Sequence, residues 1–180
     1  MWNFMTLDGL FEGAKSWDLD WHQYVWSNEL EQISLEQLRS AEMLLFGRVT
    51  YQGMAAYWQT AQGESAELMN SLPKVVFSRT LERADWANTK LLKGNVAVEI
   101  RELKRQGDRD MFVFGSAHLS ATLIEQRLFD EYRVGIAPVL LGRGKTLFGT
   151  QANRLGLKLL EARPLSSGCV ILRYQPQPSR

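Results

Sequence analysis

Three short and almost entirely apolar runs, separated by helical patterns, do most to limit the fold of this chain. The runs are Met43–Phe46, Lys74–Phe77 and Met111–Phe114. Runs of this length and apolar content are typical of strands that are covered on both faces. The segments between them are patterned as helices, as in Val96–Arg105, where apolar residues recur at helical spacing. Strands that alternate with helices predict an α/β protein with a mostly parallel sheet.

The two ends of the chain add further strands to this plan. Trp2–Thr6 predicts a first strand, which ends at the Asp8-Gly9 turn signal. Leu157–Ala162 and Cys169–Tyr174 flank a turn and predict an antiparallel hairpin. We therefore expect a mixed, mostly parallel sheet with a C-terminal antiparallel hairpin. The other expected elements are a strand at Tyr132–Val139 and helices from about Asn28, at Thr50–Trp58, at Ser65–Ser71 and around Leu119 and Leu123.

Length and composition limit the class of protein. A chain of 180 residues fits one domain, which we assign to residues 1–175, with residues 176–180 as a frayed tail. A net charge of +1 gives no electrostatic case for nucleic acid or an anionic membrane. The single cysteine, Cys169, lies in an apolar stretch and indicates a buried strand residue rather than a reactive thiol. No signal peptide and no apolar run of ~20 residues is present, so we expect a cytoplasmic protein.

The segment Gly47-Arg48-Val49-Thr50 follows the first apolar run and opens a helix. Open α/β sheets bind ligands outside the carboxyl ends of their strands, so this segment is a candidate site. The free N–H groups and positive dipole end of a helix N-terminus favour phosphate, and Arg48 adds further donors. Thr50 could cap the helix or contact a phosphate. The alternative interpretation is a plain turn at Gly47 with a solvated Arg48.

Two later strand ends carry related features. Ser78 and Arg79 follow the second run, and a hydroxyl beside a guanidinium suits the 2′-phosphate of an adenosine ribose. An ordinary exposed turn is the alternative there. Gly115 and Ser116 follow the third run and open another helix, which again places backbone N–H groups where a pyrophosphate could bind. Taken alone this third signal is weak, because many such turns contain Gly-Ser.

Two other motifs do not hold. The segment Gly142–Thr146 ends like a Walker A loop, but Val139 stands where that loop needs its first glycine. Leu147 stands where a dinucleotide motif needs its third, so we interpret the segment as a Gly-rich turn. The two histidines, His22 and His118, have no zinc-type spacing, and we expect no metal site. His118, in the first turn of a helix, is interpreted as a surface or cap residue.

The first loops hold the candidates for contact with a substrate. Asp8 could bind a substrate at its strand end, or serve only the Asp-Gly turn. The neighbouring indoles of Trp17, Trp21 and Trp26 could form a stacking wall or part of the core. We assign Trp26 to the core and leave Trp21 open. His22 could line a pocket or lie on the surface.

In combination, these motifs resemble the dihydrofolate reductase superfamily. The chain is most similar to stand-alone proteins related to the C-terminal reductase domain of the bifunctional riboflavin-biosynthesis deaminase-reductase. The resemblance runs from Trp2 to about Tyr174, and it implies a three-layer fold with helices on both faces of the sheet, NADPH as cofactor and a homodimer. Its markers, in order, are Thr6–Gly9, Asp18–His22, Leu44–Tyr51, Pro73–Arg79, Phe114–Ser116 and Pro138–Gly144.

The resemblance also implies roles for the residues at the strand ends. Gly47, Arg48 and Thr50 match the family's Gly-Arg-x-Thr phosphate site. Ser78 and Arg79 match its Ser-Arg pair near the 2′-phosphate. Gly115 and Ser116 fall on its Gly-Gly turn at the pyrophosphate, with serine in place of the second glycine.

The substrate is less well defined than the cofactor. The riboflavin enzymes typically carry Ser-x-Asp-Gly-Lys in the first loop, whereas Leu10 stands here in place of that lysine. Folate enzymes use an acid on the first helix to protonate the pterin; Glu29, Glu31 and Glu36 lie on the corresponding helix here, and the resemblance does not single out one of them. The resemblance is to 5-amino-6-(5-phosphoribosylamino)uracil reductase of riboflavin biosynthesis and to dihydrofolate reductase.

We therefore predict an NADPH-dependent reductase of a small heterocyclic substrate, with its catalytic residues unassigned. Asp8, Trp21 and His22 are the candidates on the substrate side. The expected partners are a small molecule and a second copy of the chain, with no nucleic acid and no membrane. The alternative is a non-catalytic NADPH- or nucleotide-binding dimer that kept the fold and lost the reaction.

Overall fold

The computed structural model describes residues 1–149 and 154–178, and the chain forms two compact units. The central unit is one continuous segment, residues 32–128. The terminal unit combines residues 1–31 with the chain from residue 129 onward. No helix in the described segments is long and apolar enough to span a membrane.

A parallel four-stranded sheet forms the middle of the central unit, and it confirms all three apolar runs as strands. Its strands are β3 (Ala41–Gly47), β4 (Lys74–Phe77), β5 (Thr89–Leu92) and β6 (Asp110–Val113). Their spatial order is β5-β4-β3-β6, and every neighbouring pair is parallel. The side chains of Leu44, Phe46 and Val76 are fully buried on one face, and those of Leu45 and Val75, on the other face, are 3% and 1% exposed. Both faces of the sheet are therefore covered, as their apolar runs indicate.

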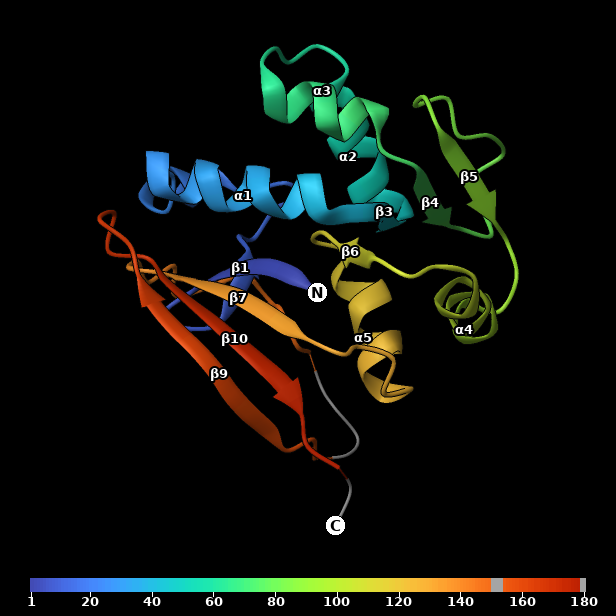
Figure 1. Cartoon of the computed structure of the whole chain (residues 1–180). Coiled ribbons are helices and arrows are strands. Elements are labelled where there is room, and N and C mark those ends of the chain that lie inside the picture. The colour runs from blue at the N-terminus through green and yellow to red at the C-terminus, as the bar shows by residue number, and fades with distance from the viewer. Residues whose placement is uncertain (150–153, 179–180) are drawn as a thin grey trace. The chain divides into compact units, whose positions relative to one another are not determined.

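Helices follow the strands of this sheet. Their bounds are α2 (Arg48–Trp58), α3 (Glu64–Ser71), α4 (Val96–Gln106) and α5 (Ala117–Glu125). Within the central unit, α2 and α3 lie on one side of the sheet and α4 and α5 on the other (Figure 1). Helix α4 begins where the Asn95 side chain accepts hydrogen bonds from the N–H groups of Ala97 and Val98. Such a cap satisfies N–H groups that lack intrahelical partners.

A buried lysine ends helix α3. Lys74 is only 1% exposed, and its Nζ donates to the carbonyl oxygens of Met69, Asn70 and Leu72 at 2.8, 3.1 and 2.6 Å. The same ammonium lies 4.6 Å from the ring centre of Trp86. Burial lowers the pKa of Lys74 to about 8. The ammonium group thus hydrogen-bonds to carbonyl groups at a helix C-terminus, where a positive charge is favourable.

The terminal unit contains a mixed sheet with the strand order β1-β7-β10-β9. Strands β1 and β7 are parallel, whereas β10 is antiparallel to both β7 and β9. The predicted C-terminal hairpin is therefore confirmed. Strand β10 runs to Pro176, and the Gln177 N–H donates to the Gly156 carbonyl at 2.8 Å. The four strands are β1 (Trp2–Thr6), β7 (Tyr132–Ala137), β9 (Leu157–Pro164) and β10 (Val170–Pro176).

Four further elements complete the described structure. Strands β2 (Leu10–Glu12) and β8 (Lys145–Thr146) form an antiparallel ribbon. A 3-10 helix, η1, spans Asp20–Tyr24, and helix α1 (Asn28–Ser40) runs from the terminal into the central unit.

The prediction for Trp26 is wrong, whereas the burial predicted for Cys169 is confirmed, although Cys169 lies one residue before β10. Trp26 is 53% exposed, whereas its neighbour Val25 is fully buried. Adjacent residues between η1 and α1 point to opposite sides, and the smaller one occupies the core. Cys169 is fully buried, and burial raises the pKa of its thiol to about 11.

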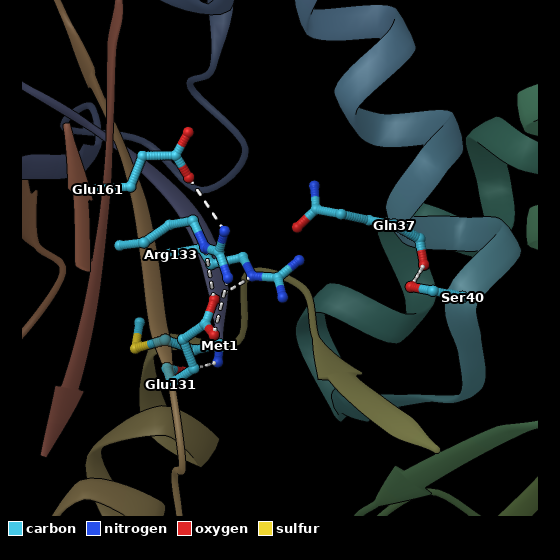
Figure 2. Close-up of polar contacts among 7 residues, drawn as sticks. Met1, Gln37, Ser40, Glu131, Arg133 and Glu161 are labelled. Carbon is cyan, nitrogen blue, oxygen red and sulfur yellow. Dashed lines mark hydrogen bonds and ion pairs between the residues drawn. The ribbon is translucent and has the colours of Figure 1, made fainter. Parts of the chain in front are cut away.

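An ion-pair network lies on the mixed sheet of the terminal unit. The Glu131 carboxylate accepts from Nε of Arg133 at 2.5 Å (Figure 2). It also accepts from Nε of Arg173 at 2.9 Å. Arg173 also contacts Glu161 at 3.0 Å, so two arginines share two glutamates. The Met1 amino group donates to the Glu131 carbonyl at 2.7 Å, which fixes the start of the chain to this network.

Candidate functional site

The strand order of the central sheet places one strand boundary where ligands are expected. The chain adds β4 and then β5 on one side of β3, and then adds β6 on the other side. Open α/β sheets bind ligands at the carboxyl edge where the strand order reverses in this way. The two turns at this switch point are Gly47, between β3 and α2, and Gly115-Ser116, between β6 and α5. Two of the three predicted strand ends therefore meet at the expected place.

The turn at Gly47 leaves the start of α2 open. No side chain caps the helix, and the N–H groups of its first turn have no intrahelical acceptors. Gly47 has φ −80°, and a Cβ there would lie 3.7 Å from the nearest atom, Cβ of Leu119, which is ordinary contact. The fold would thus accept a side chain at Gly47. Arg48 is exposed, donates to Gln52 Oε1 at 3.1 Å, and pairs with no carboxylate in the described residues.

The turn before α5 has an unusual backbone. Gly115 and Ser116 both have positive φ, at 60° and 61°. Glycine adopts the left-handed region freely, but serine there costs about 1 kcal/mol. Ser116 is nevertheless only 5% exposed, so its side chain lies beneath the surface of the turn.

Hydrogen bonds join the two turns in both directions. The Gly47 N–H donates to Ser116 Oγ at 3.0 Å, and the Ser116 N–H donates to Thr50 Oγ1 at 3.0 Å. Ser116 Oγ in turn donates to the Phe114 carbonyl at 3.3 Å. Thr50 therefore does not cap its own helix; its hydroxyl accepts from the neighbouring turn.

The second predicted strand end lies beside the first, because Gly47 and Phe77 are paired in register. Ser78 Oγ accepts from the N–H groups of Thr80 and Leu81 at 3.2 and 3.0 Å, so it organises the turn after β4. Arg79 is exposed and has no hydrogen bond or ion pair with any described residue. The serine is the ordinary turn residue that we gave as the alternative, whereas the arginine remains available to an anion.

The sequence analysis missed one cation at this edge. Strand β5 is parallel to β4, and the Ser78 N–H donates to the Leu92 carbonyl at 3.0 Å. Lys93 follows directly and is exposed. The sequence signal before it is short: Leu91 and Leu92 are the apolar end of β5. Arg48, Arg79 and Lys93 thus follow three neighbouring parallel strands.

In the terminal unit, Asp8 connects two loops. Its carboxylate accepts from Thr6 Oγ1 at 2.5 Å and from the Gly142 N–H at 2.8 Å. These hydrogen bonds, that from Thr6 first, lower the pKa of Asp8. The structure therefore shows a turn role for Asp8. The Gly-rich segment is also a structural turn, because a Cβ on Gly144 would lie 2.2 Å from the Glu12 carbonyl oxygen.

Trp21 and His22 differ in exposure. Trp21 is 1% exposed and belongs to the core, whereas His22 is partly exposed. The ring centres of these two residues lie 4.4 Å apart, and that of Phe4 lies 5.7 Å from His22. Burial lowers the pKa of His22 to about 4, so the imidazole is neutral near pH 7. No other described residue hydrogen-bonds to the imidazole ring of His22.

Comparison with models of known protein families shows the family of this chain. The model of the RibD C-terminal domain matches residues 1–171. The chain belongs to the RibD C-terminal domain family. Uncharacterized protein YyaP of Bacillus subtilis (strain 168) is 32% identical over 175 residues, which cover 94% of this chain and 90% of that protein.

Solved structures agree with this RibD C-terminal domain assignment. A putative riboflavin biosynthesis protein from Shewanella sp. PV-4 superposes with a TM-score of 0.80 at 20% identity, covering 98% of this chain and 97% of that one. Dihydrofolate reductase from Enterococcus faecalis, solved with NADP(H), gives 0.65 at 12% identity, covering 97% and 94%. The predicted dihydrofolate reductase-like fold is therefore confirmed.

Among the described residues, no group of His, Cys, Asp and Glu side chains is arranged to hold a metal ion.

Proposed function

We propose that this member of the RibD C-terminal domain family is an NADPH-dependent reductase whose cofactor binds at the carboxyl edge of the central sheet. One observation carries the proposal. Two helix N-termini without side-chain caps, those of α2 and α5, begin at the switch point of a parallel sheet. Paired N-termini favour a pyrophosphate, because each offers N–H groups and the positive end of a helix dipole.

The flanking cations fit the rest of such a cofactor. Arg79 and Lys93 follow the two strands beyond β3 and suit a 2′-phosphate, which distinguishes NADPH from NADH. Arg48, at the first position of α2, suits the pyrophosphate. NADPH, when bound, would supply a hydride, and the residues named here would bind and orient the cofactor.

The proposed substrate is a small heterocycle. This chain lacks the lysine with which the riboflavin enzymes hold the phosphate of their substrate. Leu10 stands where the riboflavin enzymes have lysine, and it is 8% exposed. Of the candidates on the substrate side, Asp8 and His22 keep exposed surface, whereas the buried Trp21 would act only through the ring of His22, 4.4 Å away. A neutral His22 can donate one hydrogen bond and accept another, which suits an uncharged ring.

Calorimetric titration with NADPH tests the cofactor, and quenching of tryptophan fluorescence reports it independently. We expect binding of NADPH and much weaker binding of NADH. Absence of heat and of quenching with millimolar NADPH would overturn the proposal. Consumption of NADPH with pterin, pyrimidine and quinone acceptors then tests the reaction. Binding without consumption would favour the non-catalytic dimer.

We also propose that the protein is a homodimer that uses strand β9. This strand lies at the edge of its sheet, and Leu159 and Leu160 are 50% and 43% exposed. An edge strand with apolar side chains gains from being covered by a second chain. Light scattering should give twice the mass of the chain, and a monomer mass would refute the dimer.

A further inference from the structure

Ser116 occupies a position that suits glycine better, and it is held there by bonds to another turn. Its φ of 61° places it in the left-handed region, and its side chain is almost fully buried. The hydroxyl accepts from Gly47, a residue far away in the sequence. The unfavourable backbone is therefore offset by a contact that a glycine could not make.

The two hydrogen bonds between the turns are reciprocal. The side chain of Ser116 accepts from the backbone at Gly47, and the backbone at Ser116 donates to the side chain of Thr50, both at 3.0 Å. Each turn precedes one of the two helix N-termini of the proposed cofactor site. A shift of one turn relative to the other would break both bonds. The pair therefore fixes the spacing of the two helix N-termini.

We propose that Ser116 is a positioning residue that, together with Thr50, clamps the two turns into the arrangement that binds the pyrophosphate before NADPH arrives. The inference rests on the proposed function and deepens it. The 5% exposure of Ser116 places the clamp beneath the site, so its hydroxyl acts through the turns rather than on the phosphate. A site ordered in advance loses less conformational freedom when ligand binds, and so binds more tightly.

The clamp acts on one part of the cofactor only. The pyrophosphate would bridge both turns, whereas the 2′-phosphate would meet Arg79 and Lys93, which lie after other strands. Inorganic pyrophosphate and 2′-AMP therefore probe the two regions separately. Loosening the clamp should weaken pyrophosphate and NADPH but not 2′-AMP.

Calorimetric titration of the full chain with these three ligands tests the clamp. Ser116→Ala keeps the Cβ and removes only the hydroxyl. We expect it to weaken NADPH and pyrophosphate about fivefold, the size of one neutral hydrogen bond, and to leave 2′-AMP within about twofold. Thr50→Val should act in the same direction, and Thr50→Ser, which keeps the acceptor oxygen, should restore binding. Amide hydrogen exchange at Gly47 should be faster in Ser116→Ala.

The outcomes separate the clamp from the cofactor assignment. Tighter or unchanged pyrophosphate binding by Ser116→Ala would overturn the clamp, because the hydroxyl would then merely compete with ligand. Equal weakening of 2′-AMP would also overturn it, since that result indicates general loss of structure. If Ser116→Ala fails to fold, Thr50→Val and Thr50→Ser provide the test. The measured quantity is again the loss of pyrophosphate affinity relative to the loss of 2′-AMP affinity. Wild-type protein that binds neither NADPH nor pyrophosphate would remove the proposed function and the clamp together.

Discussion

The ring of Phe4 lies where a side chain of Gly135 would be. A Cβ on Gly135 would sit 2.4 Å from Cδ1 of Phe4 and 3.2 Å from Cδ1 of Ile171. The glycine in β7 therefore makes room for an aromatic ring on the neighbouring strand, β1. That ring also contacts His22, so the glycine helps to position a candidate residue on the substrate side.

Gly135→Ala should lower the free energy of unfolding by about 1–3 kcal/mol, because the added methyl overpacks the sheet. Urea denaturation measures the change. Gly47→Ala is the matched control: its Cβ meets only ordinary contacts and its φ is −80°, so its stability should match or slightly exceed wild type. Equal stability of Gly135→Ala and wild type would show that Phe4 moves away without cost.

Arg79→Ala should weaken NADPH about tenfold and leave NADH nearly unchanged, because only NADPH carries the 2′-phosphate. Calorimetric titration of both nucleotides measures the difference. Arg83→Ala serves as the control, since Arg83 is also exposed but pairs with Asp85 at 3.0 Å. An equal loss for the two nucleotides would assign Arg79 a general electrostatic role instead.

Stability should rise with pH between 8 and 10.5 through Lys74. Burial lowers the pKa of this amine from 10.5 to about 8, so in this window the unfolded chain binds more protons than the folded one. By linkage, stability then increases with pH. Urea denaturation of wild type and Lys74→Met across the window isolates the effect. A constant difference between the two proteins would show that the ammonium is not desolvated.

NMR titration should place the pKa of His22 near 4. Burial disfavours the charged imidazole, so the unfolded chain takes up the proton first, and stability is lost as pH falls from 6.5 towards 4. The chain has one other histidine, His118, and the His118→Gln variant assigns the signals. The His22→Phe variant should lack this acid-dependent loss. A midpoint near 6.5 would mean that the imidazole is solvated.

Local sequence patterns located the pieces of the candidate site but not their arrangement. Gly47, Ser78 and Gly115 could be predicted at strand ends, because apolar runs and glycines are local signals. That β6 lies beside β3 depends on which crossover the chain takes, and no single segment encodes it. Lys93 was missed for the same reason, since its role depends on the pairing of β5 with β4.

The direction in which a side chain points was the other property that the sequence did not predict. Trp26 and Val25 are both apolar, and only tertiary contacts decide which of the two enters the core. The hydrogen bonds of Ser116 likewise join residues from separate parts of the sequence. Helix and strand bounds fared better because they depend on periodicity within a few residues; Lys74–Phe77 is predicted and observed with the same ends.

Strand β1 can pair only after β7 has been synthesised. All strands of the central sheet lie within residues 41–113, so a growing chain holds the complete sheet early. Strand β1 is made first, but its partner ends at Ala137, and β7 waits further for β10. The first strand must therefore stay unpaired on the ribosome while most of the protein emerges, and Trp2 and Phe4 are apolar rings exposed during that time. A chaperone that binds nascent apolar segments would therefore find a target in β1.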